Sequence, residues 1–474
     1  MESCHVDEVR LKANFALNPK NKATLGQFMT PSVIADYMAS LFVPVNKEVR
    51  LMDCGAGIGS LTISAVKALK RVAIIELWEL DPIMCIYLEQ NIRALEKPYV
   101  IHLEDYIHDS VNRIICKTGS QFTHAIINPP YRKIKSSSDY RKTLRSIGIE
   151  TVNLYSAFLA LTIKMMEKDG QIVAIIPRSF CNGPYYKSFR EQMLLECSID
   201  HIHVFESRNQ AFKDDDVLQE NIIIKLTKNA KQRDVTLSTS HNQLFNDYIE
   251  KTVSFKSIVK DSDKERFIHI PINELDIKND LFKIELAALS VTVSTGPVVD
   301  FRMKEFLEKE PTKTTAPLLY SHHFVNGQLE YPKQHKKANA IRITPETEKW
   351  LMPNGFYVLV KRFTAKEEKK RVVAQIIDPQ DINALKIGFE NHWNVFHFKK
   401  HGINETLAKG LACFLNSTQL DNYFRVFSGH TQVNATDLKN IKYPTLEVLM
   451  DLGKHYNTQM SQNQIDELII GAVY

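Results

Sequence analysis

The sequence predicts a doubly wound α/β sheet followed by a second domain of mixed α+β structure. Short apolar runs of strand length recur through the first 230 residues, and longer segments with helical spacing separate them. In the second half this alternation gives way to irregular strand-like pieces, isolated helical stretches and turns. Because 474 residues exceed one typical core, we expect two domains, residues 1–235 and 236–474.

The elements of the first domain follow from apolar spacing. A helix is expected to begin at Thr30-Pro31, a capping residue followed by proline, because Ile34 and Met38 then recur at helical spacing. A long helical pattern ending at Gly170 lies between the fourth and fifth of seven predicted strands. These strands are the runs VRLMD, IIELWE, YVIHLED, HAIIN, QIVAIIP, HIHVFE and NIIIKL.

Composition excludes several classes of protein. Apolar residues make up 44% and charged residues 24%, as in ordinary globular proteins. Seven cysteines without a C-x-x-C pair, and no histidine cluster at ligand spacing, predict reduced thiols and no metal. The opening MESCHVDEVRLKANF lacks the apolar core of a signal peptide, so we expect a cytoplasmic protein. A net charge of +5 permits a polyanionic partner without demanding one.

Three acidic residues follow successive predicted strands. Asp53 precedes a glycine loop that contains Gly55 and Gly57, Glu79 follows the next strand, and Asp105 follows the third. The glycines allow a sharp turn and close approach of a ligand, a pattern that alone does not exclude NAD. Three carboxylates at one sheet edge suit a cationic, adenosine-containing ligand without phosphates better than an anionic dinucleotide. S-adenosylmethionine (SAM) has that description.

The fourth strand ends in Asn128-Pro129-Pro130-Tyr131. The two prolines donate no hydrogen bond and fix a rigid turn that presents acceptors. The Asn128 side-chain oxygen and the Pro129 carbonyl could hold both hydrogens of an exocyclic amino group and direct its lone pair toward an electrophile. The Tyr131 ring offers a face on which a planar substrate can stack, and a base in duplex DNA would have to be flipped out to reach it.

These motifs resemble those of the γ-class DNA N6-adenine methyltransferases of type II restriction–modification systems, with a TaqI-like catalytic domain. Stretches such as STGPVVDFR and FSGHTQVNATDLKNIKYP are similar to the BsuBI and PstI type of modification enzyme, so the resemblance runs end to end. It implies a SAM-dependent methyltransferase (Rossmann-like) sheet and a C-terminal target-recognition domain. It also implies a bacterial enzyme that pairs functionally with a restriction endonuclease.

The resemblance assigns further roles in the first domain. Phe28, Thr30 and Pro31 would lie over the methionine part of SAM, Glu79 would bind the ribose, and Asp105 would read the cofactor's adenine amino group. The glycine loop with Asp53, Gly55 and Gly57 would bind the methionine part, and Asn128 would contact both cofactor and substrate. A second aromatic residue would sandwich the flipped adenine; by order of elements this is Phe212, with Phe205 as the rival.

The second domain carries a basic strip, KRFTAKEEKKR, in which an aromatic residue lies among the charges. Such a strip can track phosphates, and a solvated charged surface is an equally good interpretation of any single residue. Arg362 could read guanine, and Gln432 and Asn434 could read adenine. The candidate DNA-binding residues are Lys361, Arg362, Lys369, Lys370, Arg371, Gln432 and Asn434.

Two other functions remain open from sequence. The same Asn-Pro-Pro-Tyr motif serves methyltransferases that act on RNA bases or on a protein glutamine, and a non-catalytic DNA specificity module could retain the fold. The basic C-terminal extension favours double-stranded DNA as the partner. An enzyme that modifies one strand at a time can work as a monomer, so we expect a monomer.

Overall fold

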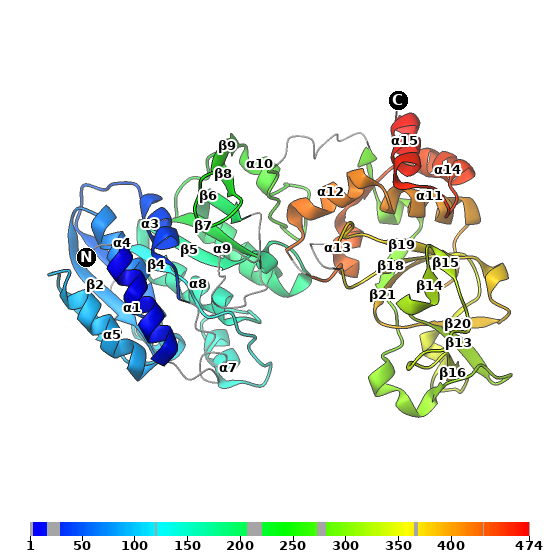
Figure 1. Ribbon diagram of the computed structural model, residues 1–474, viewed down its shortest axis with the longest axis horizontal. Coiled ribbons are helices and arrows are strands. Elements are labelled where there is room, and N and C mark those ends of the chain that lie inside the picture. Colours follow the sequence, from blue (N-terminus) through cyan, green and yellow to red (C-terminus); the bar gives the residue numbers. More distant parts are fainter. Residues whose placement is uncertain are drawn as a thin grey trace. The chain divides into compact units, whose positions relative to one another are not determined.

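In the computed structural model the chain forms two compact units, Met1–Ile272 and Asn273–Tyr474, which we describe separately (Figure 1). The structure describes residues 3–16, 29–118, 121–205, 220–272, 281–364, 368–429 and 431–473. No helix within these ranges is long and apolar enough to cross a bilayer. The units divide at residue 272 instead of the expected 235, because two further strands join the first unit's sheet.

The first unit contains a nine-stranded sheet with the order β3-β2-β1-β4-β5-β7-β6-β8-β9. Strands β1 to β5 run parallel, and β7 is antiparallel to both of its neighbours. The doubly wound prediction is thereby confirmed, and all seven predicted strands are present. The strands are β1 (Val49–Cys54), β2 (Val72–Trp78), β3 (Tyr99–His102), β4 (Phe122–Ile127), β5 (Met166–Pro177), β6 (Cys197–Phe205), β7 (Asn221–Lys228), β8 (Val235–Ser240) and β9 (Ile249–Val253).

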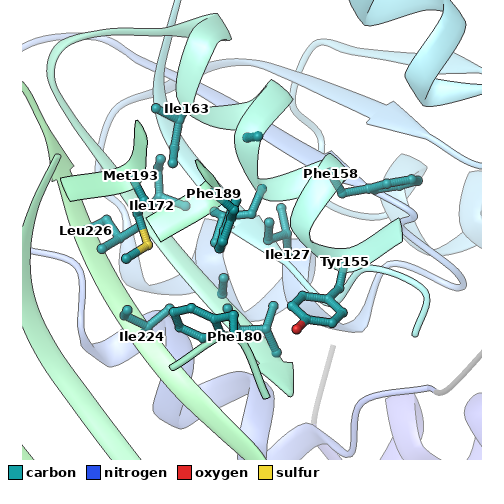
Figure 2. Close-up of a cluster of buried hydrophobic side chains, with 14 of the residues drawn as sticks. Ile127, Tyr155, Phe158, Ile163, Ile172, Phe180, Phe189, Met193, Ile224 and Leu226 are labelled. Carbon is teal, nitrogen blue, oxygen red and sulfur yellow. The ribbon is translucent and has the colours of Figure 1, made fainter. Parts of the chain in front are cut away.

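Helices cover both faces of this sheet. Apolar side chains of α3, α4 and α5 form a buried cluster on one face, and those of α6, α7, α8 and α9 form a larger cluster on the other. Figure 2 shows part of the larger cluster, where Tyr155 and Phe158 of α8 lie near Ile127 of β4. The helices are α1 (Ser3–Ala16), α3 (Ser32–Ser40), α4 (Ser60–Ala68), α5 (Pro82–Arg93), α6 (Tyr106–Cys116), α7 (Asp139–Arg145), α8 (Leu154–Met165), α9 (Lys187–Glu196) and α10 (Phe255–Ile258).

The strand order reverses at β1, which pairs with β2 on one side and β4 on the other. In doubly wound sheets, ligands bind in the crevice at such a switch point, outside the carboxyl ends of the strands. The residues that follow β1, β2, β3 and β4 are therefore expected to surround one site.

One predicted boundary is wrong. The helical pattern expected to end at Gly170 ends at Met165, and β5 begins at Met166. Met166 pairs with Phe122, and Gln171 pairs with His124, so the intervening residues form an irregularity in the strand. Tertiary pairing has overridden local helical spacing here.

The second unit is mixed α+β, as predicted. It contains a four-stranded sheet with the order β11-β21-β18-β19 and a five-stranded sheet with the order β12-β16-β13-β20-β17. Its other strands form two-stranded pairs. The strands are β10 (Ile284–Glu285), β11 (Thr292–Thr295), β12 (Leu307–Glu308), β13 (Thr315–Leu319), β14 (Phe324–Val325), β15 (Gln328–Leu329), β16 (Ala340–Arg342), β17 (Leu351–Pro353), β18 (Tyr357–Lys361), β19 (Ala374–Ile377), β20 (Lys386–Phe389), β21 (Trp393–His397) and β22 (Lys442–Tyr443).

Within the described residues, five α-helices follow β21 in the chain, with β22 between α13 and α14, and α11 packs against α14. They are α11 (Glu405–Leu415), α12 (Thr418–Phe427), α13 (Ala435–Asn440), α14 (Leu446–His455) and α15 (Gln462–Val473).

Candidate active site

A pocket lies at the carboxyl ends of β1 to β4 in the first unit, where the strand order predicts a ligand site. Its lining includes six of the predicted cofactor residues: Thr30, Gly55, Gly57, Glu79, Asp105 and Asn128. Of the others, Pro31 precedes α3, Asp53 is fully buried at the end of β1, and Phe28 lies outside the described residues.

The glycine loop joins β1 to α4. Gly57 has φ +58° and donates its N–H to Glu79 Oε2 at 2.8 Å. Gly59 has φ +85°, and a Cβ there would lie 2.9 Å from the Leu88 Cδ1 atom of α5. The third glycine of the G-x-G-x-G spacing is therefore required for close packing of α4 on α5, whereas Gly57 shapes the pocket wall.

Two buried carboxyl groups lie behind this loop. Glu79 Oε1 accepts hydrogen bonds from the N–H groups of Leu80 and Asp81, each at 2.9 Å. Asp53 Oδ2 accepts from Thr62 Oγ1 at 2.7 Å, while its Oδ1 has no partner among the described residues. Burial, with the Glu79 charge nearby, raises the pKa of Asp53 to about 7. Burial also raises the pKa of Glu79. Carboxyl groups at such depth ionise readily only beside a positive charge, and the acceptor oxygens that line this pocket fit the cationic cofactor SAM.

Asp105 caps α6. Its Oδ1 accepts from the N–H groups of Ile107 and His108, each at 3.0 Å, and its Oδ2 accepts from the Tyr140 hydroxyl. The carboxylate is thus a helix cap that also faces the pocket. Sequence reasoning missed Tyr140, which lies in the polar segment KSSSDYRK, and an isolated aromatic residue in such a segment was the only signal.

Asn128 is held on both sides. Its Nδ2 donates to Thr30 Oγ1 at 2.9 Å, and its Oδ1 accepts from the Tyr131 hydroxyl at 2.9 Å. These two bonds fix which end of the amide faces which neighbour. Thr30 therefore has a positioning role that the sequence did not indicate.

Tyr131 is anchored by its hydroxyl. The oxygen also lies 3.3 Å from the Ile175 carbonyl, and the ring meets the Tyr155 ring edge-on at 6.4 Å. Burial raises the Tyr131 pKa, so the hydroxyl remains a neutral donor. The following segment is pinned by a hydrogen bond of 2.7 Å from the Leu154 N–H to the Arg132 carbonyl. Pro129 is buried, and Pro130 lines the pocket. Stacking of a base on Tyr131 stays a prediction.

Phe212, the predicted second stacking residue, lies outside the described residues. Its rival Phe205 is 2% exposed at the end of β6. The Phe205 ring packs against His203 at 4.7 Å and Phe245 at 6.0 Å. Phe205 is a core residue, so the structure gives it no face for a substrate.

In the second unit the two predicted DNA-binding segments lie side by side. The Val433 N–H donates to the Arg362 carbonyl at 2.8 Å, and Phe363 forms a β-bridge with Gln432. Lys361 and Arg362 are thereby next to Gln432, although seventy residues separate them in sequence. Lys369 is exposed.

Three of the predicted DNA contacts hydrogen-bond to other residues of the second unit. Arg371 is 1% exposed, with its Nε donating to Thr364 Oγ1 at 3.3 Å, so it is not available to a phosphate. Lys370 Nζ donates to the Asn416 carbonyl, and burial lowers the Lys370 pKa. Asn434 caps α13, and its Nδ2 donates to Asp437 Oδ2 at 3.1 Å.

A doubly wound sheet with an antiparallel β7 between β5 and β6, and a pocket at the β1–β4 switch point, defines a SAM-dependent methyltransferase fold. Within the described residues, no three His, Cys, Asp or Glu side chains are grouped as a metal site would require.

Comparisons with known proteins narrow this class. A model of the Eco57I restriction-modification methylase family matches residues 69–212. The chain is 49% identical over 468 residues to the type II methyltransferase M.BsuBI of Bacillus subtilis, covering 95% of this chain and 93% of the relative. It is 43% identical over 492 residues to the type II methyltransferase M.PstI of Providencia stuartii, covering 98% and 96%. The solved DrdV–DNA complex aligns with a TM-score of 0.55 at 12% identity, over 95% of this chain and 59% of that one.

This chain belongs to the type II methyltransferases of restriction–modification systems. The family resemblance that the sequence motifs predicted is confirmed.

Proposed function

We propose that this protein transfers a methyl group from SAM to N6 of an adenine flipped out of duplex DNA. The modification would protect that DNA from a cognate restriction endonuclease. The observation that carries the proposal is the Asn128 amide, which is held between Thr30 and Tyr131 at the edge of a pocket with buried carboxylates. We further propose that the enzyme acts as a monomer.

The chemistry follows from the acceptors at the end of β4. Asn128 Oδ1 and the Pro129 carbonyl accept the two N–H groups of the adenine amine, which turns the nitrogen lone pair out of conjugation. SAM, when bound, supplies a methyl group on a positively charged sulfur. The neutral amide orients the amine without burying another charge, and the nitrogen releases one proton after the N–C bond forms and the S–C bond breaks.

The cofactor assignments rest on the pocket. Glu79 would bind the ribose hydroxyls, since it directly follows β2 and its carboxylate lies against the glycine loop at the pocket. Asp105 would accept from the cofactor's adenine amino group once the Tyr140 hydroxyl moves aside. A cationic ligand would favour the ionised form of the buried Asp53, whose pKa is raised to about 7.

The second unit would supply target recognition. Lys361, Arg362 and Lys369 are the predicted basic residues that remain available to DNA, and the Gln432 side chain is half-buried beside Arg362. A basic surface of this kind has no use in a methyltransferase that modifies a protein glutamine.

The test is methyl transfer from labelled SAM to unmodified duplex DNA, RNA and protein. We expect label in DNA as N6-methyladenine, at one sequence, in a host that expresses the chain. Asn128→Ala should lower kcat by about 10²- to 10³-fold, as loss of one oriented polar group in an active site does. SAM affinity, measured by calorimetry, should change far less. Labelling of RNA or protein alone, or full activity of Asn128→Ala, would refute the proposal.

A further inference from the structure

At one end of the second unit's four-stranded sheet, an aromatic ring and an imidazole lie together on the surface. Strands β18 and β21 are antiparallel, with Lys361 opposite Trp393, so the residues just after β18 and just before β21 meet. The Phe363 ring is 45% exposed and packs edge-on against His392 at 4.8 Å. The His392 side chain is 50% exposed.

A buried acid, Glu390, lies beside His392. Glu390 is fully buried, and its Oε1 lies 3.0 Å from His392 Nδ1. Its Oε2 accepts from the His392 N–H at 2.9 Å. With Nδ1 turned toward Glu390, the imidazole directs Nε2 away from the unit's interior. Burial raises the pKa of Glu390 to about 7.

Two further groups complete the patch. Arg362 lies with its guanidinium 5.8 Å from the Phe363 ring and donates from Nη1 to the Asn391 carbonyl at 3.2 Å. Gln432 faces Phe363 across the β-bridge, and no described residue hydrogen-bonds to its amide. The patch therefore combines a guanidinium, an imidazole, an amide and an exposed ring from three neighbouring segments. These are the side chains that read hydrogen-bonding edges and methyl groups of base pairs.

We infer that Phe363, His392 and Gln432 form a base-contact patch for duplex DNA in the second unit, with Glu390 as the positioning residue for His392. The inference rests on the proposed function and extends it from Gln432, which the sequence already suggested, to Phe363, His392 and Glu390. His392 Nε2 and the Gln432 amide contact base edges, and Phe363 makes the apolar contact between them.

A matched control, Phe398, lies at the other end of β21 from His392. Phe398, just beyond the opposite end of β21, is 44% exposed and has the Lys399 ammonium 5.4 Å from its ring. It shares the aromatic-plus-cation pairing of Phe363, whereas its β-bridge partner is His401. A general effect of losing an exposed aromatic residue would therefore affect Phe398→Ala and Phe363→Ala equally.

The experiment uses the full chain and begins by mapping the methylated sequence in host DNA. Phe363→Ala, His392→Ala and Gln432→Ala should each lower kcat/KM on that sequence by about 10-fold or more, while Phe398→Ala stays near wild type. The three variants should also relax the preference over sites with one changed base pair, and SAM affinity should be unchanged. Glu390→Ala should also relax the sequence preference, because it removes the carboxyl group that accepts from the His392 N–H.

The outcomes separate the two proposals. If wild type methylates DNA but Phe363→Ala and Gln432→Ala keep its rate and preference, the patch is wrong and the proposed function stands. Equal losses in Phe363→Ala and Phe398→Ala also overturn the patch. If wild type methylates no DNA, both proposals fail. Phe363 and Gln432 are surface residues, so these two variants decide the matter even if Glu390→Ala does not fold.

Discussion

The two units hold their candidate functional residues in opposite ways. In the first unit the polar atoms of the site bond to one another below the surface, as in the series Thr30, Asn128 and Tyr131. In the second unit two of the three basic residues that remain available to DNA, Lys361 and Lys369, make no side-chain hydrogen bond or ion pair to a described residue, and the third, Arg362, donates only to the Asn391 carbonyl. Chemistry on a small group needs preorganised atoms, whereas phosphate contacts need charges free to reach a partner.

One basic residue of the second unit, Arg371, is buried and hydrogen-bonded like the site residues of the first unit, so it tests whether the contrast holds throughout the second unit. Arg371→Ala should lower the free energy of unfolding by about 3 kcal/mol, because it removes a buried guanidinium that packs over Phe424 and bonds to Thr364. Denaturant unfolding measures the change. Lys369→Ala, two residues away and exposed, should stay within about 0.5 kcal/mol of wild type. Equal stability of the two variants would contradict the structural role of Arg371.

The cost of burying charge in the first unit can be measured through Asp53. Burial raises its pKa from 3.8 to about 7, so the folded chain binds this proton more tightly than the unfolded chain does. The resulting stability is complete below pH 3.8 and is lost as pH rises through 7.

Asp53→Asn carries no charge at any pH and should escape that loss. In SAM-free enzyme, we expect the variant to unfold roughly 2 to 4 °C above wild type at pH 8, with the difference shrinking toward pH 5. Asp139→Asn, whose side chain is 76% exposed, is the control and should show no such pH-dependent gain. A constant difference across pH would mean that Asp53 is not the group that titrates.

Removing the hydroxyl of Tyr131 tests its role in positioning Asn128 separately from the stacking role of its ring. Tyr131→Phe keeps the ring and removes the donor to Asn128 Oδ1, so kcat should fall about 5- to 10-fold, as expected for one hydrogen bond of about 1 kcal/mol. The KM for DNA should change less. Tyr155→Phe, which removes a hydroxyl bonded to Ser179 instead, should leave kcat within about 2-fold. Single-turnover methylation distinguishes the two, and equal effects would show that the Asn128 contact has no special part.

The first unit was readable from sequence because strand ends and motif residues coincide. Six predicted cofactor residues line one pocket, since parallel strands bring their carboxyl ends to one edge. Tyr140 and the positioning role of Thr30 were not readable, because neither follows from periodicity or from a strand end. The second unit was harder, because Lys369 and Arg371 belong to the same charged run in sequence. Arg371 is buried because it hydrogen-bonds to Thr364 and Asp421 and lies over the Phe424 ring. Asp421 lies fifty residues further along the chain than Arg371, so the charged run alone does not predict this burial.

Lys369→Ala should have the smallest effect of these variants, and it separates phosphate contacts from base contacts. An exposed lysine that neutralises one phosphate adds an affinity that is independent of base sequence and weakens with salt. Lys369→Ala should therefore weaken DNA binding about 3-fold at low salt, lower the slope of log K against log salt by about 1, and leave sequence preference unchanged. Fluorescence anisotropy over a salt series measures both quantities. Phe363→Ala should do the reverse, relaxing preference with the slope unchanged, because it removes a base contact and no charge. A changed sequence preference in Lys369→Ala would mean that Lys369 belongs to the base-contact patch and does not contact phosphate alone.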